Sequence, residues 1–157
     1  MTDERPPYLR WRYLGLVALG GAIGTAVRAA LATAFPAVHG ISWAILVINV
    51  VGAFCLGLLL DALAHRGTDV GGRRAIRLFV GTGVLGGFTT YSTLADDTAQ
   101  LLTAGRWGAG TGYALLTVVV GLVAAAAGLW LAARFRPTVG PSESAARLRP
   151  DEDGGGR

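Results

Sequence analysis

Glycine and hydroxyl residues gather in the middle of one apolar stretch of the chain. Residues 81–94 read GTGVLGGFTTYSTL, so that adjacent glycines precede two β-branched threonines. Such a run is a poor helix interior, because both residue types lose conformational freedom in a helix. A membrane helix broken at Gly86-Gly87 would leave backbone carbonyls free, and free carbonyls at mid-membrane suit a hard monovalent cation. The alternative is an intact helix that packs closely through glycine, with Gly83 and Gly87 forming a GxxxG pair.

A polar stripe continues beyond the expected break. Its members recur at helical spacing and are Thr89, Thr93, Asp96 or Asp97, and Gln100. An acidic residue within the membrane core marks an ion path, whereas the same residue at the outer interface carries no such meaning. The sequence leaves both interpretations of the two aspartates open.

The other apolar stretches each carry one polar feature that could act on an ion. Asn49 lies in the middle of the second stretch, where its amide must hydrogen-bond to another helix or to a permeant ion. Arg28 lies toward the end of the first, where it can snorkel or offer positive potential to an anion. Tyr113 and Thr117 lie on a small or hydroxylated face of the last stretch, which suits helix packing or a hydroxyl ladder beside a pore.

Four apolar segments must position these residues, and they cover roughly 13–35, 42–64, 76–102 and 108–135. Each has the roughly 20 residues that a helix needs to cross the hydrocarbon core. The chain is 52% hydrophobic and 15% charged, whereas soluble domains carry about a quarter charged residues. We therefore predict an all-α membrane protein of four transmembrane helices, with the third helix broken.

The ends of the chain differ from this transmembrane domain. We assign residues 1–12 to a cytoplasmic N-terminal segment, 13–136 to the four-helix domain and 137–157 to a tail. The tail is rich in Gly, Pro, Ser and charge, so it cannot bury a core, and we predict that it is disordered.

The arginines predict how the chain lies in the membrane. The net charge of +4 comes from arginine alone, because the chain has no lysine. With four crossings, nine arginines fall on one side: Arg5, Arg10, Arg12, Arg66, Arg73, Arg74, Arg77, Arg134 and Arg136. Apart from Arg28, the other side has only Arg106. The chain is then expected to cross the inner membrane several times, and the positive-inside rule places both of its termini on the cytoplasmic side. Because the arginines alternate with apolar runs, we predict lipid contact and no nucleic-acid binding.

No arrangement of residues predicts an enzyme. His39 and His65 fall in loops, and neither pairs with a serine or cysteine in a nucleophile-elbow motif. The single cysteine, Cys55, excludes a disulfide within the chain and a cysteine metal site.

Taken together, these motifs resemble the CrcB/Fluc family of fluoride channels. The resemblance rests on Gly21-Ala22-Ile23-Gly24 through Arg28, on Asn49-Val50-Val51-Gly52 and on residues 83–93. It covers roughly residues 13–135, with all four segments in order.

The resemblance implies a four-helix subunit that pairs antiparallel with a homologous subunit and conducts fluoride passively out of the cytoplasm. It implies a structural Na⁺ at the dimer centre, which is not transported and is held by the backbone of Gly86 and Thr89. Arg28 becomes the vestibule arginine. The residues implied for the ion path are Asn49, Tyr91, Ser92, Thr93, Leu94, Tyr113 and Thr117. Fluoride binds water tightly, so a pore must replace that water with hydrogen-bond donors, which hydroxyl and amide groups can supply.

The sequence departs from the family pattern at several of these positions. Tyr91 and Leu94 stand where the family has phenylalanines, and Asp97 replaces the usual glutamate. Gly121 replaces the second hydroxyl of the last segment. A subunit that inserts in both orientations should carry little charge asymmetry, whereas this chain is strongly asymmetric. We therefore favour a heterodimer with an oppositely oriented homologue, and a homodimer stays open.

Two other functions are weighed against a channel. A small four-helix multidrug-type transporter needs a membrane-embedded glutamate in its first helix, where this chain has Arg28. A non-conducting structural subunit of a channel would suit the GxxxG pairs, but it gives no reason for Asn49 or for the expected break.

Overall fold

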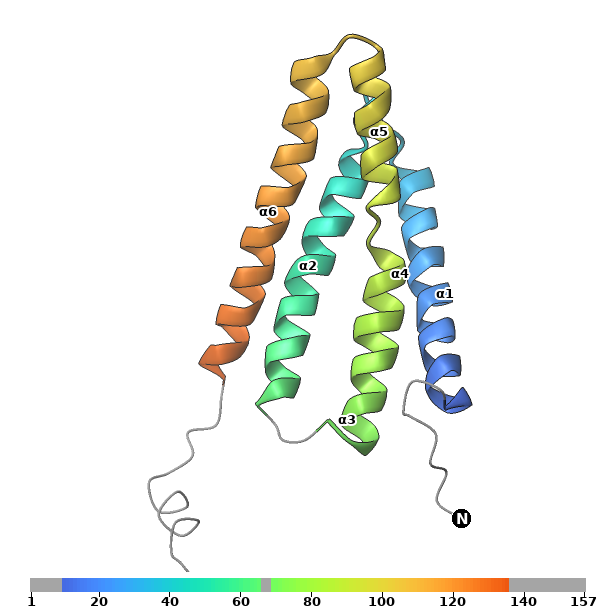
Figure 1. Ribbon diagram of the computed structural model, residues 1–157, viewed down its shortest axis with the longest axis vertical. Helices are drawn as coiled ribbons and strands as arrows, with labels where there is room; N and C mark the ends of the chain where they lie inside the picture. The colour runs from blue at the N-terminus through green and yellow to red at the C-terminus, as the bar shows by residue number, and fades with distance from the viewer. Residues whose placement is uncertain (1–9, 66–68, 136–157) are drawn as a thin grey trace, which may run out of the picture.

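The computed structural model describes residues 10–65 and 69–135 as a bundle of helices (Figure 1). Three helices are long and apolar enough to cross a membrane: α1 (Trp11–Ala34), α2 (Trp43–Ala64) and α6 (Trp107–Arg134). The remaining crossing is divided into α3 (Gly71–Ile76), a π-helical segment η2 (Arg77–Leu85), α4 (Gly86–Phe88) and α5 (Ser92–Thr103). Within the described residues the only β structure is an isolated bridge between Val38 and Ile41. The all-α fold with a broken third helix is thereby confirmed.

Some predictions concern parts of the chain beyond this description. The predicted tail at 137–157 lies outside the described residues, as does most of the predicted N-terminal segment at 1–12. Both assignments stay predictions.

The break in the third helix lies at the threonines and not at Gly86-Gly87, so the predicted position was wrong. Gly86 and Gly87 are helical, and the backbone becomes extended at Thr89, with φ −78° and ψ 155°. A Cβ added to Gly87 would overlap the carbonyl oxygen of Gly21. This glycine therefore serves close helix packing, as the GxxxG alternative proposed, while the β-branched threonines leave the helix.

Glycines bring the helices together as two closely packed pairs. In the first pair, α1 lies against η2 and α4, and an added Cβ at Gly20 or Gly24 would overlap backbone of the broken helix. In the second pair, α2 lies against α6, with Gly57 and Gly128 at the contact. Small residues let membrane helices approach until their backbones touch, which strengthens dispersion contacts.

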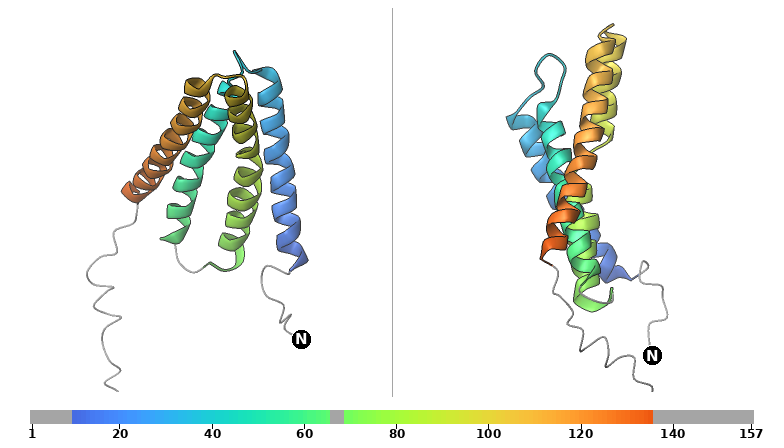
Figure 2. Two further views of the ribbon diagram at one scale, coloured as in Figure 1. Left: turned by 45° about the horizontal axis from the view of Figure 1, so that its top comes forward. Right: turned by 90° about the vertical axis from the view of Figure 1, so that its left-hand side faces the viewer.

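The broken helix changes partners at its break. Residues 77–88 pack on α1, whereas α5 packs on the first half of α6. Figure 2 (right) shows α5 beside α6, and Leu46 near the start of α2 also packs against the residues that α5 buries. Residues 89–91 therefore join the two packed pairs.

Replacing Gly87 with alanine is expected to destabilise the subunit by about 1–3 kcal/mol, since overpacking a tight contact costs that much. The physical reason is the overlap with Gly21, whose backbone cannot move aside as a flexible side chain could. Thermal unfolding of the purified protein in detergent measures the change. Gly15→Ala in α1 is the matched control, because a Cβ there meets no atom within 4 Å. Equal melting temperatures for the two variants would contradict this packing.

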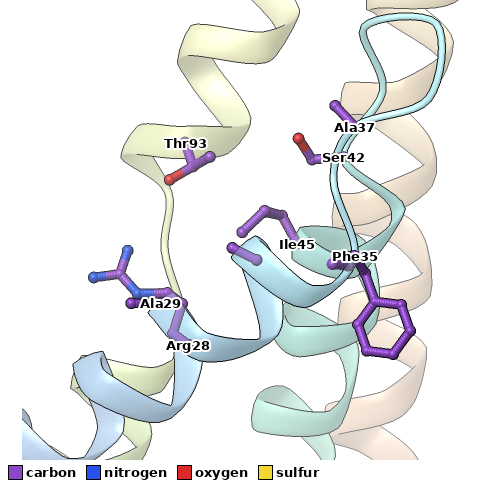
Figure 3. Close-up of a pocket in the computed structure, with 9 residues that line it drawn as sticks. Arg28, Ala29, Phe35, Ala37, Ser42, Ile45 and Thr93 are labelled. Atoms are coloured by element: carbon purple, nitrogen blue, oxygen red, sulfur yellow. The ribbon is translucent and has the colours of Figure 1, made fainter.

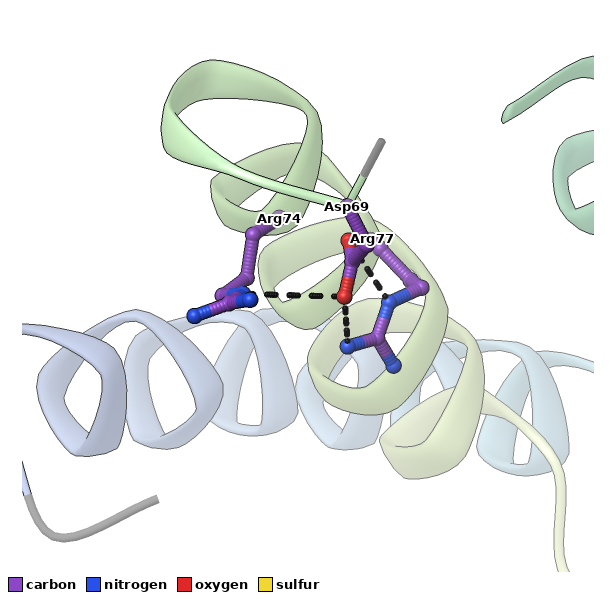
Figure 4. Close-up of polar contacts among 3 residues, drawn as sticks. All are labelled: Asp69, Arg74 and Arg77. Atoms are coloured by element: carbon purple, nitrogen blue, oxygen red, sulfur yellow. Dashed lines mark hydrogen bonds and ion pairs between the residues drawn. The ribbon is translucent and has the colours of Figure 1, made fainter. Parts of the chain in front are cut away.

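An ion cluster fixes the entry to the third crossing. Asp69 accepts hydrogen bonds from Arg77 at 3.2 Å (Nε) and 2.7 Å (Nη2), and Arg74 Nε lies 3.6 Å from the same carboxylate (Figure 4). The hydrogen bonds from Arg77 hold the pKa of Asp69 below its ordinary value of 3.8, with both arginine charges acting in the same direction. The cluster ties the chain before α3 to the start of η2.

The lowered pKa predicts how this entry responds to acid. Its contribution to stability is complete above the ordinary pKa of 3.8 and is lost as the pH falls through the lowered value. We expect the amides of residues 75–77, which follow the unbonded first turn of α3, to lose protection from hydrogen exchange between pH 7 and pH 3, after correction for intrinsic rates. Asp69→Asn should be poorly protected at both values, whereas Asp96→Asn, at the far end of the bundle, should behave as wild type. A pH-dependent loss that survives in Asp69→Asn would argue against the cluster.

Candidate functional site

A hollow of about 370 Å³, here called the polar groove, lies between α2, the broken helix and α6. Its lining brings together six of the residues singled out in the sequence: Asn49, Gly86, Thr89, Tyr91, Leu94 and Thr117. Thr90 and Gly121 line it as well. Residues from three separate crossings thus face one space at the level of the helix break.

Asn49 bridges α2 to the broken helix. Its amide nitrogen donates to the carbonyl of Thr90 at 2.9 Å, and its amide oxygen accepts the N–H of Thr90 at 2.8 Å. The side chain therefore satisfies both backbone groups of a residue that has left the helix, as buried backbone in a membrane requires. An amide nitrogen carries two hydrogens, so one remains to donate into the groove.

The same bonds free two carbonyls of the broken helix. In a continuous helix the N–H of Thr90 would donate to Gly86 and that of Thr93 to Thr89. Here the first donates to Asn49 and the second to the Thr90 hydroxyl, at 3.4 Å. Outside the helices, no backbone N–H of the described residues donates to the carbonyl of Gly86 or to that of Thr89. Both residues line the groove, and Gly86 is exposed.

Several hydroxyls near the groove already donate their only proton. Thr89 donates to the carbonyl of Leu85 at 2.9 Å, and Thr117 donates to that of Tyr113 at 2.8 Å. Tyr113 donates to the carbonyl of Ser42 at 3.2 Å. In this geometry Thr117 and Tyr113, both predicted for the ion path, offer lone pairs and no proton to an ion.

A second hollow of about 310 Å³, here called the arginine hollow, lies where the end of α1 meets the starts of α2 and α5. Arg28, Ser42, Ile45 and Thr93 line it (Figure 3). The Nε of Arg28 is buried, and among the described residues it has no hydrogen-bond partner. A buried guanidinium N–H beside a threonine is suited to an anion, which is the chemistry predicted for Arg28.

The two positions where the family has phenylalanines behave differently. Tyr91, in the break, is 80% exposed, so its ring is covered by no other part of the subunit. Leu94 is 6% exposed and packs with Leu101 and Tyr113. The subunit therefore presents one aromatic ring outward at the break, and the second position belongs mainly to its own core.

The two aspartates of the polar stripe also differ. Asp96 is exposed and accepts a hydrogen bond from Gln100 at 2.9 Å. Asp97 is half-buried, and its Oδ2 is a buried oxygen with no hydrogen-bond partner in the described part of the chain. Of the two, Asp96 matches the interpretation as a surface residue.

Sequence reasoning missed Thr90 as a site residue. It is 7% exposed, and its hydroxyl lies 3.1 Å from that of Ser92 and 3.2 Å from that of Thr93. A threonine just before a helix commonly accepts an N–H of the first turn, and Thr90 has the residue type for this role. The sequence alone did not show that a helix begins just after Thr90, because the start of α5 depends on the position of the break.

Comparisons with known proteins agree with these motifs. A family model described as CrcB-like protein, Camphor Resistance (CrcB), matches residues 15–129. Fluoride-specific ion channel FluC 2 of Leifsonia xyli subsp. xyli is 54% identical over 128 residues, which cover 82% of this chain and 88% of the relative. Fluoride-specific ion channel FluC 1 of Cutibacterium acnes is 49% identical, with 78% and 83% covered. Fluoride-specific ion channel FluC of Chelativorans sp. is 42% identical, with 76% and 95% covered.

Proposed function

We propose that this chain, which belongs to the CrcB family, is a subunit of a passive channel through which fluoride leaves the cytoplasm. Its relatives are named as ion channels, and the chain is a multi-pass membrane protein without an enzymatic role. The observation that carries the proposal is the broken third helix, whose Thr90 backbone is bound by Asn49 at the edge of the polar groove. It occurs in a chain that is 54% identical to a fluoride-specific channel.

The uncommitted donors support an anion as the cargo. An anion that leaves water must gain hydrogen-bond donors in exchange, because a bare charge in low dielectric is costly. Asn49 lines the polar groove and has one amide hydrogen beyond the bond to Thr90, and the Nε–H of Arg28 has no partner among the described residues. Tyr91 adds a hydroxyl and an electropositive ring edge. Passive flow suffices, since a negative cell interior drives anions outward.

We further propose that the backbone of Gly86 and Thr89 binds a structural Na⁺, which is not transported. The two freed carbonyls are hard oxygen ligands, and the open space at Gly86 lets another chain approach. An oppositely oriented subunit would supply a matching pair. When bound, Na⁺ would supply positive charge that offsets part of the cost of bringing an anion into the membrane.

The exposed Tyr91 at the helix break supports an antiparallel partner subunit. The asymmetric distribution of arginines favours a partner that is a different, homologous chain. Six described arginines lie at one end of the bundle: Arg10, Arg12, Arg73, Arg74, Arg77 and Arg134. Arg106 lies at the other end, where it donates to the carbonyl of His39. By the positive-inside rule we place the arginine-rich end, with both termini, on the cytoplasmic face of the inner membrane. One fixed orientation requires a partner of the opposite one.

Fluoride efflux from liposomes tests the proposal. The full chain and an adjacent homologue are reconstituted separately and together, and efflux of fluoride is compared with that of chloride. We expect fluoride-selective efflux that is robust only with the homologue. Robust efflux from the lone chain would overturn the heterodimer and leave the channel. No efflux in either preparation would overturn the channel and favour a multidrug-type transporter, while a homologue that conducts equally well without this chain would make it a structural partner.

A further inference from the structure

We propose that Thr90 is a positioning residue, whose hydroxyl decides whether Ser92 or Thr93 keeps a proton free for an anion. The inference rests on the proposed anion conduction. It starts from a connection between the two hollows: Thr90 lines the polar groove, and Thr93 lines the arginine hollow. Their hydroxyl oxygens are 3.2 Å apart.

The hydrogen-bond geometry at Thr90 has two solutions. Its Oγ1 has three neighbours within hydrogen-bond distance: the N–H of Thr93 at 3.4 Å, the Thr93 hydroxyl at 3.2 Å and the Ser92 hydroxyl at 3.1 Å. A hydroxyl donates one proton and accepts at two lone pairs. The N–H can only donate, so it takes one lone pair. Of the two neighbouring hydroxyls, one must then donate to Thr90 and the other must accept from it.

Each solution leaves one different proton unused. When Thr90 donates to Thr93, the proton of Thr93 is free on the side of the arginine hollow, and Ser92 donates to Thr90. When Thr90 donates to Ser92, the proton of Ser92 is free, and that of Thr93 is held. Rotation of the three hydroxyls together thus exchanges the two states without breaking the backbone bonds to Asn49.

This exchange matters because other hydroxyls nearby are committed. Thr89, Tyr113 and Thr117 each donate to a backbone carbonyl. Beside the arginine hollow, the Nε–H of Arg28 has no partner among the described residues. In the first state the hollow therefore offers an anion two donors, one from Arg28 and one from Thr93. In the second state the Thr93 donor is withdrawn.

A set of threonine variants tests the role of the Thr90 hydroxyl. Thr90→Val removes it at nearly constant shape, so that no hydroxyl donates to Thr93 and orients its proton toward the arginine hollow. We expect fluoride efflux to fall about tenfold, which is the effect on a rate of losing one well-oriented hydrogen bond to an anion. Thr90→Ser keeps the hydroxyl and should restore most of the efflux. Thr98→Val is the matched control, since Thr98 donates its proton to Leu94 at 2.7 Å and lines neither hollow. Equal efflux from wild type and Thr90→Val, or failure of Thr90→Ser to rescue, would overturn the proposal.

A double-mutant cycle separates positioning from a general loss of structure. Thr93→Val should lower efflux in the wild-type background and change it by less than about twofold in the Thr90→Val background, as coupled residues do. Equal factors in both backgrounds would refute the coupling.

Fluoride titration followed by amide NMR of Ser92 and Thr93 gives a readout that needs no conduction. We expect fluoride-dependent shifts, absent with chloride, that Thr90→Val abolishes and Thr90→Ser keeps. Unaltered shifts in Thr90→Val would overturn the proposal even if no preparation conducts. A wild type without efflux would overturn the proposed function alone.

Discussion

Replacing Asn49 with aspartate is expected to lower fluoride efflux by about a thousandfold. Two unit charges about 4 Å apart repel by about 4 kcal/mol at an effective dielectric constant of about 20, which corresponds to that factor in rate. The variant also turns the donor to Thr90 into an acceptor. A carboxylate oxygen would then face the Thr90 carbonyl across a gap that a 2.9 Å hydrogen bond now closes. Liposome efflux in the preparation in which wild type conducts measures the effect.

Gln100→Glu is the matched control for this change. It converts the same amide into the same carboxylate on an exposed face of α5, away from both hollows. We expect efflux close to that of wild type. Size-exclusion chromatography of Asn49→Asp must show a folded protein for the comparison to hold. Wild-type efflux from a folded Asn49→Asp protein would remove Asn49 from the conduction path.

Replacing Gly86 with valine is expected to lower efflux by tenfold or more and to remove its dependence on Na⁺. No atom of the subunit lies within 4 Å of a Cβ at this position, so the first atom of the new side chain meets no neighbour within the subunit. The valine would instead crowd the freed Gly86 carbonyl and the surface on which we place a partner. Overpacking such a contact costs about 1–3 kcal/mol, or roughly tenfold in an equilibrium. Efflux is compared in sodium and in N-methylglucamine solutions.

The control for this variant is Gly15→Val on α1. Gly15 also has no atom within 4 Å of an added Cβ, and it lies far along the bundle from the break. The two variants therefore make the same change in a helix and differ in the surface they alter. If Gly86→Val kept wild-type efflux and wild-type dependence on Na⁺, neither the cation site nor a close partner could lie at Gly86.

The crossings could be predicted because their signals are local. Length and apolar character define α1, α2 and α6, and the run of glycine and threonine indicates that the third crossing is interrupted. The position of the break could not be predicted in the same way. Gly87 has a poor helix propensity, yet packing against Gly21 keeps it helical, and that contact depends on a segment far away in the chain.

The candidate site was predictable in its residue types and less so in their bonding. The resemblance assigned Asn49 and Thr117 to one ion path, and both line the polar groove. It could not show that Thr117 has already donated its proton, because that depends on the rotamer of the side chain. It also missed Thr90, whose importance comes from the several partners that converge on one buried hydroxyl.

The change of partners at residues 89–91 has a mechanical consequence. Backbone contacts at glycine hold α1 to the first half of the broken helix and α2 to α6, so each pair resists deformation. Asn49 holds the short connection between them through two hydrogen bonds to one residue. If the bilayer became thinner or thicker and one pair slid along the other, the strain would concentrate at this connection. The site that we assign to the ion would then respond first to the thickness of the surrounding lipid.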